Sequence, residues 1–112
     1  MENTLKIDCR ADPGKKRKTF LLEGELDVHQ AKELRSRFLE ELEDDTGWAY
    51  TLDMTAVSYL DSSGLGMLVY LKKEISRKDG ELVIVSLRES VANVFRLTRL
   101  DEFFGIPPAD GA

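Results

Sequence analysis

Strand-like and helix-like patterns alternate along most of this chain. Strands are expected at residues 19–24, 48–54 and 81–86, and amphipathic helices at 28–42 and 65–75. A strand, a helix and a second strand in this order pair the two strands in parallel, through a right-handed crossover. Two such units in succession predict an α/β domain.

A further strand is expected near the N-terminus. Residues 5–9 alternate between apolar and polar side chains, which is typical of a half-buried strand. A turn at Asp12-Pro13-Gly14 reverses the chain, so this strand is expected to pair antiparallel with 19–24. With a third helix capped by Ser90, the order is β-β-α-β-α-β-α around a mixed sheet of four to five strands. We expect one domain over residues 4–106 and a flexible tail at 107–112.

Apolar residues at spacings of three and four mark one buried face on each long helix. The strand at 81–86 is apolar almost throughout, which predicts a central parallel strand covered on both faces. The last apolar residues are expected to fold back onto the core. The expected buried positions are Val28, Ala31, Leu34, Phe38 and Leu42 in the first helix, Leu65, Leu68, Leu71 and Ile75 in the second, and Leu100, Phe103, Phe104 and Ile106 near the C-terminus.

Composition restricts the classes of function. The 112 residues carry 16 basic and 21 acidic side chains, a net charge of −5. This charge argues against general nucleic-acid binding, because that affinity depends on neutralising phosphates. The one basic run, 15–18, is expected to be a solvated hairpin tip, with partner docking as the alternative.

Nothing in the sequence indicates a membrane or secreted protein. No apolar run approaches the ~20 residues that span a bilayer, and the first residues lack a signal-peptide pattern. The single cysteine, Cys9, suits a reducing compartment. We therefore expect a cytoplasmic protein without a membrane partner.

The residues Asp61-Ser62-Ser63-Gly64-Leu65-Gly66 form the candidate site. They follow a strand expected to end near Met54, and they open the most apolar helix. Asp is a common helix N-cap, and glycines let a helix end approach a sheet. The same place, where backbone N–H groups meet the positive end of a helix dipole, also suits a phosphate, either bound there or formed on a serine. Spacing alone leaves both interpretations open.

Conventional catalysis is difficult to assemble from this sequence. The only histidine, His29, is expected on the outer face of the first helix, and no nucleophile elbow, P-loop or dinucleotide motif is present. Asp27, Asp53 and Asp61 could meet at the carboxyl ends of parallel strands and hold Mg²⁺; the alternative is one helix cap and two solvated acids. We expect no enzymatic activity, no metal and no other cofactor. An enzyme or nucleotide-binding domain that uses these carboxylates and Ser62 is the alternative.

Three features together resemble the STAS domain of bacterial anti-sigma factor antagonists. Gly24-Glu25-Leu26-Asp27 closes the second strand before a helix. Leu52-Asp53 is followed, after a short link, by residues 61–66. Gly80-Glu81-Leu82 opens a strand that precedes a helix beginning at Ser90-Val91. The resemblance extends over nearly the whole chain, from about residue 5 to residue 106.

The resemblance implies a switch between partners. In that family the unphosphorylated antagonist binds an anti-sigma factor that is itself a serine kinase, and the displaced sigma factor directs transcription. The kinase uses ATP to phosphorylate a serine at the start of the second helix, and the antagonist then dissociates. A serine phosphatase that depends on manganese or magnesium restores the active form. By position after Asp61, the phosphorylated serine falls on Ser62, with Ser63 as the second choice.

The interaction surface is expected to surround this serine. STAS-like domains also occur in stressosomes, in lipid-transport complexes and on anion transporters. An accessory subunit of a stressosome or of a lipid-transport complex is therefore the alternative function. The expected partner-binding residues are Asp27, His29, Tyr59, Asp61, Ser62, Ser63, Gly64 and Leu65.

Overall fold

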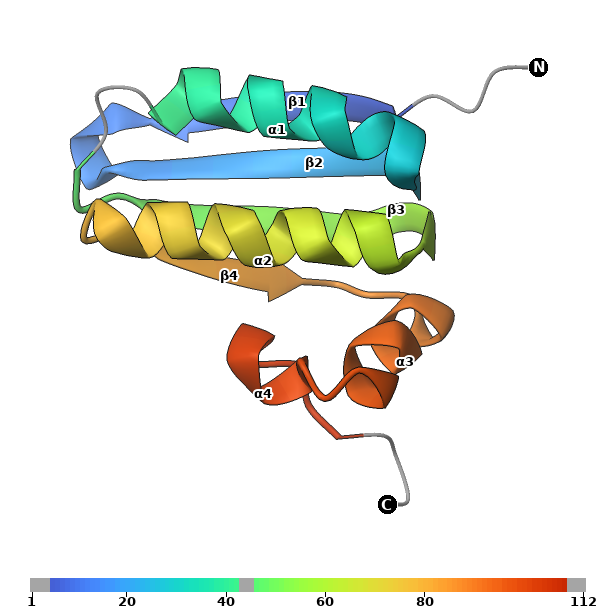
Figure 1. The fold of residues 1–112 in the computed structure, drawn as a ribbon. Helices are drawn as coiled ribbons and strands as arrows, with labels where there is room; N and C mark the ends of the chain where they lie inside the picture. Colours follow the sequence, from blue (N-terminus) through green and yellow to red (C-terminus); the bar gives the residue numbers. More distant parts are fainter. Residues whose placement is uncertain (1–4, 43–45, 109–112) are drawn as a thin grey trace.

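The computed structural model of the protein describes residues 5–42 and 46–108, which form a four-stranded sheet with two long helices on one face (Figure 1). The strands are β1 (Leu5–Asp12), β2 (Arg17–Leu26), β3 (Ala49–Leu60) and β4 (Glu81–Val85). The helices are α1 (Val28–Leu42), α2 (Ser62–Arg77), α3 (Glu89–Leu97) and α4 (Asp101–Phe104), with one 3-10 turn at Pro13–Lys15.

The strands lie in the sheet in their sequence order, β1-β2-β3-β4. β1 is antiparallel to β2, whereas β2 with β3 and β3 with β4 are parallel. The α/β class, the mixed sheet and the predicted order of elements are confirmed, with the short helix α4 added after α3. Parallel strands need a crossover connection, which α1 and α2 provide, and both helices lie on the same face of the sheet (Figure 1).

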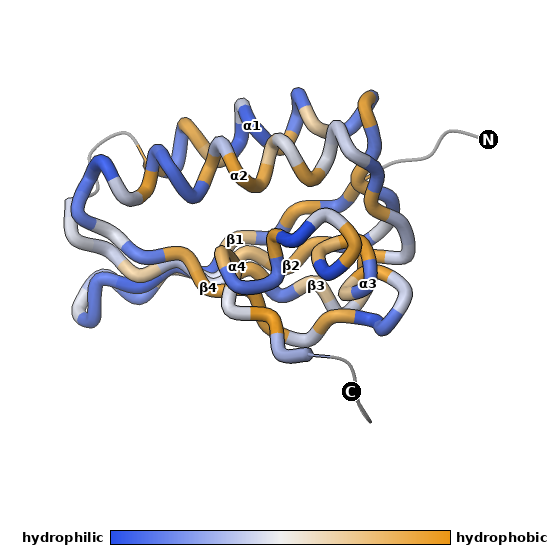
Figure 2. The backbone as a smooth tube through the Cα atoms, turned by 60° about the horizontal axis from the view of Figure 1, so that its bottom comes forward, coloured by the Kyte–Doolittle hydropathy of each residue, from blue (hydrophilic) through white to orange (hydrophobic). Residues whose placement is uncertain are grey.

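The core lies between the sheet and the layer formed by α1 and α2. Figure 2 shows this layer above the sheet, with hydrophilic and hydrophobic residues alternating along both helices. Phe38 of α1 stacks on Phe20 of β2, with ring centroids 4.2 Å apart, and Tyr50 of β3 lies 5.8 Å from Phe38. Leu52, Leu68 and the other buried apolar residues of β3 and α2 complete this core.

The prediction that residues 81–86 form a central strand is wrong. β4 pairs only with β3 and is the last strand in the sheet order. Leu82 and Ile84 point into the core, but Val83 is 42% exposed and Val85 is 37% exposed, because α1 and α2 cover one face only. An uninterrupted apolar run therefore marks here a strand with one open face.

Three residues predicted to be buried, Val28, Leu100 and Phe103, are partly or largely exposed. Val28 is the first residue of α1 and is 56% exposed, so it does not belong to the buried stripe. At the C-terminal end Phe104 and Ile106 are buried as predicted, whereas Phe103 is 39% exposed and Leu100 is half-buried. Lys72 of α2 lies over the Phe103 ring, 5.4 Å from its centroid, and covers part of it.

The basic run at 15–18 is only partly a solvated hairpin tip. The Lys18 ammonium donates to the Glu41 carbonyl at 2.6 Å and lies over the Trp48 ring. The Lys78 ammonium donates to the Leu42 carbonyl at 2.6 Å. Both lysines thus supply positive charge at the C-terminal end of α1, where acidic residues oppose the helix dipole.

Residues 109–112, most of the expected tail, lie outside the described residues. In the described parts of the chain, none of the helices combines the length and the apolar character needed to cross a membrane.

Replacing Phe38 by alanine is expected to lower the free energy of unfolding by about 3–5 kcal/mol, because the ring is fully buried and its loss leaves a cavity. Val28→Ala is the matched control on the same helix, where the exposed side chain is expected to contribute less than about 0.5 kcal/mol. Urea denaturation followed by circular dichroism measures both values. Equal losses at the two positions would contradict this packing.

Candidate functional site

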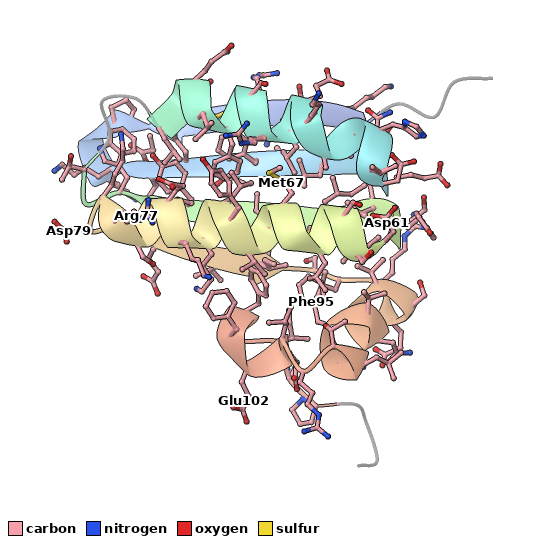
Figure 3. All side chains as sticks on the ribbon, viewed as in Figure 1. Asp61, Met67, Arg77, Asp79, Phe95 and Glu102 are labelled. Carbon is pink, nitrogen blue, oxygen red and sulfur yellow. The ribbon has the colours of Figure 1, made fainter. Side chains whose placement is uncertain are left out.

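The candidate site lies where α1 and α2 begin. The prediction that β3 ends near Met54 is wrong, because the strand continues to Leu60. Leu60 is paired with Leu26, the last residue of β2, so Asp27 and Asp61 directly follow neighbouring strand ends. The two long helices therefore start side by side at the same end of the strands. Figure 3 shows Asp61 at this end of α2.

The Asp61 carboxylate binds the first turns of both helices. One oxygen accepts a hydrogen bond from the Gly64 N–H at 2.9 Å, which caps α2. The other accepts from the Val28 N–H, the first residue of α1, at 3.3 Å. The predicted N-cap role of Asp61 is confirmed, and its contact with the second helix is additional.

Asp27 caps α1 with its own carboxylate. The same Asp27 oxygen accepts from the His29 N–H at 2.9 Å and from the Gln30 N–H at 3.1 Å. The two carboxylates thus accept hydrogen bonds from four N–H groups in the first turns of the two helices. They also place negative charge at the positive ends of two helix dipoles.

Gly64 allows α2 to approach the sheet closely. A Cβ atom at this position would lie 2.3 Å from the Leu26 carbonyl oxygen and 2.9 Å from the Leu60 side chain. No larger residue fits without moving the backbone of β2 or α2. Gly64 and Leu65 are both buried, so these two of the predicted partner-binding residues hold α2 in place from within the domain.

Ser62 and Ser63, the first two residues of α2, are exposed. Within the described residues neither hydroxyl has a hydrogen-bond partner, so neither is needed to cap the helix. Tyr59, three residues before Ser62 in the chain, is 49% exposed, and Val28 and His29 on the first turn of α1 are exposed as well. The spacing of apolar residues predicts that Val28 is buried. Its position directly after Asp27, the capping residue, is the sequence feature that would have predicted an exposed side chain.

Asp53 does not join Asp27 and Asp61. It lies in the middle of β3, level with Leu21 of β2 and Val85 of β4. The Thr55 hydroxyl donates to its carboxylate at 2.6 Å and the Thr55 N–H at 3.0 Å, and these bonds lower the pKa of Asp53 below its ordinary value. A magnesium site made of the three carboxylates is therefore not formed. No cluster of histidine, cysteine and acidic residues suited to a metal ion occurs in residues 5–42 and 46–108.

Comparison with known proteins gives a consistent result. The family model of the STAS domain matches residues 8–110. The anti-sigma-B factor antagonist of Listeria monocytogenes is 32% identical over 88 residues, which cover 79% of this chain and 76% of that protein.

Solved structures show the same fold. An anti-sigma factor antagonist from Mycobacterium paratuberculosis has a TM-score of 0.78 at 22% identity, over 95% of this chain and 87% of that chain. The Bacillus cell fate determinant SpoIIAA in its phosphorylated form has a TM-score of 0.67 at 18% identity, over 87% of this chain and 86% of that chain. With a family match over almost its whole length, this chain belongs to the STAS domain family.

Proposed function

We propose that this protein is an anti-sigma factor antagonist, and that phosphorylation of Ser62 releases it from an anti-sigma factor with serine kinase activity. The observation that supports this most directly is the exposed pair Ser62-Ser63 at the start of α2, beside the start of α1. The 32% identity to an anti-sigma-B factor antagonist supports the same function. Because the proposed kinase uses ATP, the protein would act in the cytoplasm.

The surroundings of Ser62 suit a reversible phosphate. Its hydroxyl has no partner within the described residues, so a kinase can reach it without breaking a bond of the fold. The transfer moves the terminal phosphoryl group of ATP to the Ser62 oxygen, whose proton is released, and leaves ADP. The new phosphate lies at the first turn of α2 and near that of α1, where two helix dipoles favour negative charge.

The same phosphate disfavours a bound partner. It adds roughly −1.5 to −2 charge and three acceptor oxygens. A partner surface that packs closely against the hydroxyl has no room for this larger, strongly hydrated group next to Asp61, and it loses its contacts there. Val28 at the start of α1 and Tyr59 near the end of β3 are exposed and offer apolar contact area to a partner. We infer that the free-energy cost of phosphorylation falls on the complex and leaves the fold intact.

Incubation with the cognate kinase and ATP is expected to place one phosphate on Ser62. Ser62→Ala is expected to abolish this incorporation, while Ser63→Ala retains it, because the assignment depends on the position directly after Asp61. Intact-mass and peptide mass spectrometry measure the outcome. A phosphate found only on Ser63 would move the site by one residue.

Ser62→Asp is expected to weaken binding to the anti-sigma factor at least about tenfold, which corresponds to 1.4 kcal/mol. Thermal stability is expected to change little, since a carboxylate is favourable at a helix start. Ser90→Asp is the matched control, because Ser90 is also an exposed serine in the first turn of a helix, α3. Isothermal titration calorimetry measures both affinities. Equal weakening by the two variants would argue against a local effect at α2.

Asp61→Ala is expected to lower the free energy of unfolding by about 1–2 kcal/mol, because one carboxylate caps α2 and also binds α1. Asp61→Asn retains one acceptor oxygen and is expected to lose less. Chemical denaturation gives both values. Wild-type stability in the alanine variant would show that neither helix start depends on this carboxylate.

A further inference from the structure

We propose that β1 pairs antiparallel with β1 of a second copy of this chain, about a two-fold axis at Cys9, so that two four-stranded sheets join into one continuous sheet. This pairing goes beyond the proposed switch, since it uses a different edge of the domain. Three observations support it: an unpaired strand edge, a self-complementary charge pattern and a hollow beside the edge.

β1 is the first strand of the sheet, and all of its residues, Leu5 to Asp12, pair with β2 on one side. On its other side no strand follows within the described residues. An edge of this length presents backbone N–H and C=O groups to any strand that approaches. Arg37 of α1 reaches this strand and donates to the Ile7 carbonyl at 3.3 Å, a bond that a backbone N–H of an added strand can replace.

Charged residues alternate in sign along the face of β1 that points away from the helices. They are Lys6, Asp8, Arg10 and Asp12, and all four are exposed. Within the sheet, Asp8 lies opposite Leu21 and Arg10 lies opposite Thr19, so neither faces a charged residue directly across on β2, whereas Asp12 lies opposite Arg17. The ion pair of Lys6 with Glu23, at 3.6 Å between two well-exposed side chains, contributes little.

This alternation selects one register for two antiparallel copies. With the axis at Cys9, Asp8 faces Arg10 of the second copy and Lys6 faces Asp12, and each contact occurs twice. With the axis at Asp8 or Arg10, like charges face each other. An axis at Ile7 keeps only the contacts between Lys6 and Asp8, and an axis at Ala11 keeps only those between Arg10 and Asp12. Opposite charges directly across an antiparallel pair stabilise it, and like charges destabilise it.

The helix side of the edge has room for the side chains of an added strand. Leu5 and Ile7 of β1 and Glu33, Ser36, Arg37 and Glu40 of α1 line a hollow of about 200 Å³. In the register with the axis at Cys9, Ala11 of the second copy lies opposite Ile7 and would approach this hollow. The helix wall carries both signs of charge, so Arg37 of each copy can pair with acidic residues of the other.

Such a dimer leaves Ser62 of both copies accessible to a partner. Leu5, at the start of β1, is level with Gly24 near the end of β2, and therefore lies toward the end of the sheet that carries Ser62. An axis through the middle of an antiparallel pair of β1 strands sends the two serine sites to opposite ends of the joined sheet. Two anti-sigma factors could then bind one dimer without overlap.

Analytical ultracentrifugation over a range from micromolar to millimolar protein tests the pairing. The wild type is expected to dimerise with rising concentration. Asp8→Arg and Arg10→Asp are each expected to remain monomeric, because each places like charges opposite one another. Mixing the two single variants in equal amounts is expected to restore a dimer, and so is the charge-exchanged double variant. Both positions are exposed, and circular dichroism verifies that each variant is folded.

A monomeric wild type at all concentrations would overturn the proposal. So would dimers of the single variants as strong as those of the wild type, or the lack of rescue on mixing. A dimer that is lost in Asp8→Arg but retained in Arg10→Asp would overturn the axis at Cys9 and favour the one at Ile7.

Oxidative cross-linking at Cys9 gives an independent measurement. Residues directly opposite in an antiparallel pair have Cα atoms about 4.5–5.5 Å apart, within the span of a disulfide. Diamide, which takes one hydrogen from each of two thiols, is expected to link wild-type and double-variant chains but not either single variant alone. Burial raises the pKa of the Cys9 thiol, so the oxidation is run at alkaline pH, with Cys9→Ser as the control. Equal linking of the single variants would contradict this register.

Discussion

The arrangement of the candidate site depends on one carboxylate that serves two helices. Asp61 follows β3, caps α2 through the Gly64 N–H and accepts a hydrogen bond from the first residue of α1. It thereby connects the two crossovers of the parallel sheet at the point where each one starts. The two exposed serines follow Asp61 directly in the chain, and the exposed Val28 is the residue of α1 that donates to it.

Much of the fold could be predicted from periodicity, because each crossover leaves a local pattern. The strand-helix-strand units, the hairpin and the buried faces of both long helices follow from such patterns. The position of β4 could not be predicted in this way. An apolar run is the same whether helices cover one face of a strand or two, and the covering depends on where the chain goes next. Here the C-terminal helices α3 and α4 do not cover the face of β4 on which Val83 and Val85 lie, and both side chains are exposed.

At the candidate site, the N-cap role of Asp61 could be predicted from the sequence, but the contacts of its carboxylate with α1 could not. The spacing indicated that Asp61 caps a helix and that Ser62 stands at its start. The end of β3 was placed too early, because Thr55 to Leu60 lacks strict alternation, and this error made a three-carboxylate cluster conceivable. Pairing of Leu26 with Leu60 separates Asp53 from that junction and brings Asp27 and Asp61 together. Such register is a property of two strands and cannot be derived from either one alone.

The close approach at Gly64 has a consequence for how a signal can be carried. A helix whose backbone touches the Leu26 carbonyl cannot slide or tilt toward the sheet to make room for a larger group at its first turn. A phosphate added there would therefore stand on a helix start that is fixed against the sheet. The backbone would then have the same conformation with and without the phosphate. A partner would then respond only to the charge and the volume of the phosphate at a fixed position, without a conformational change of the antagonist.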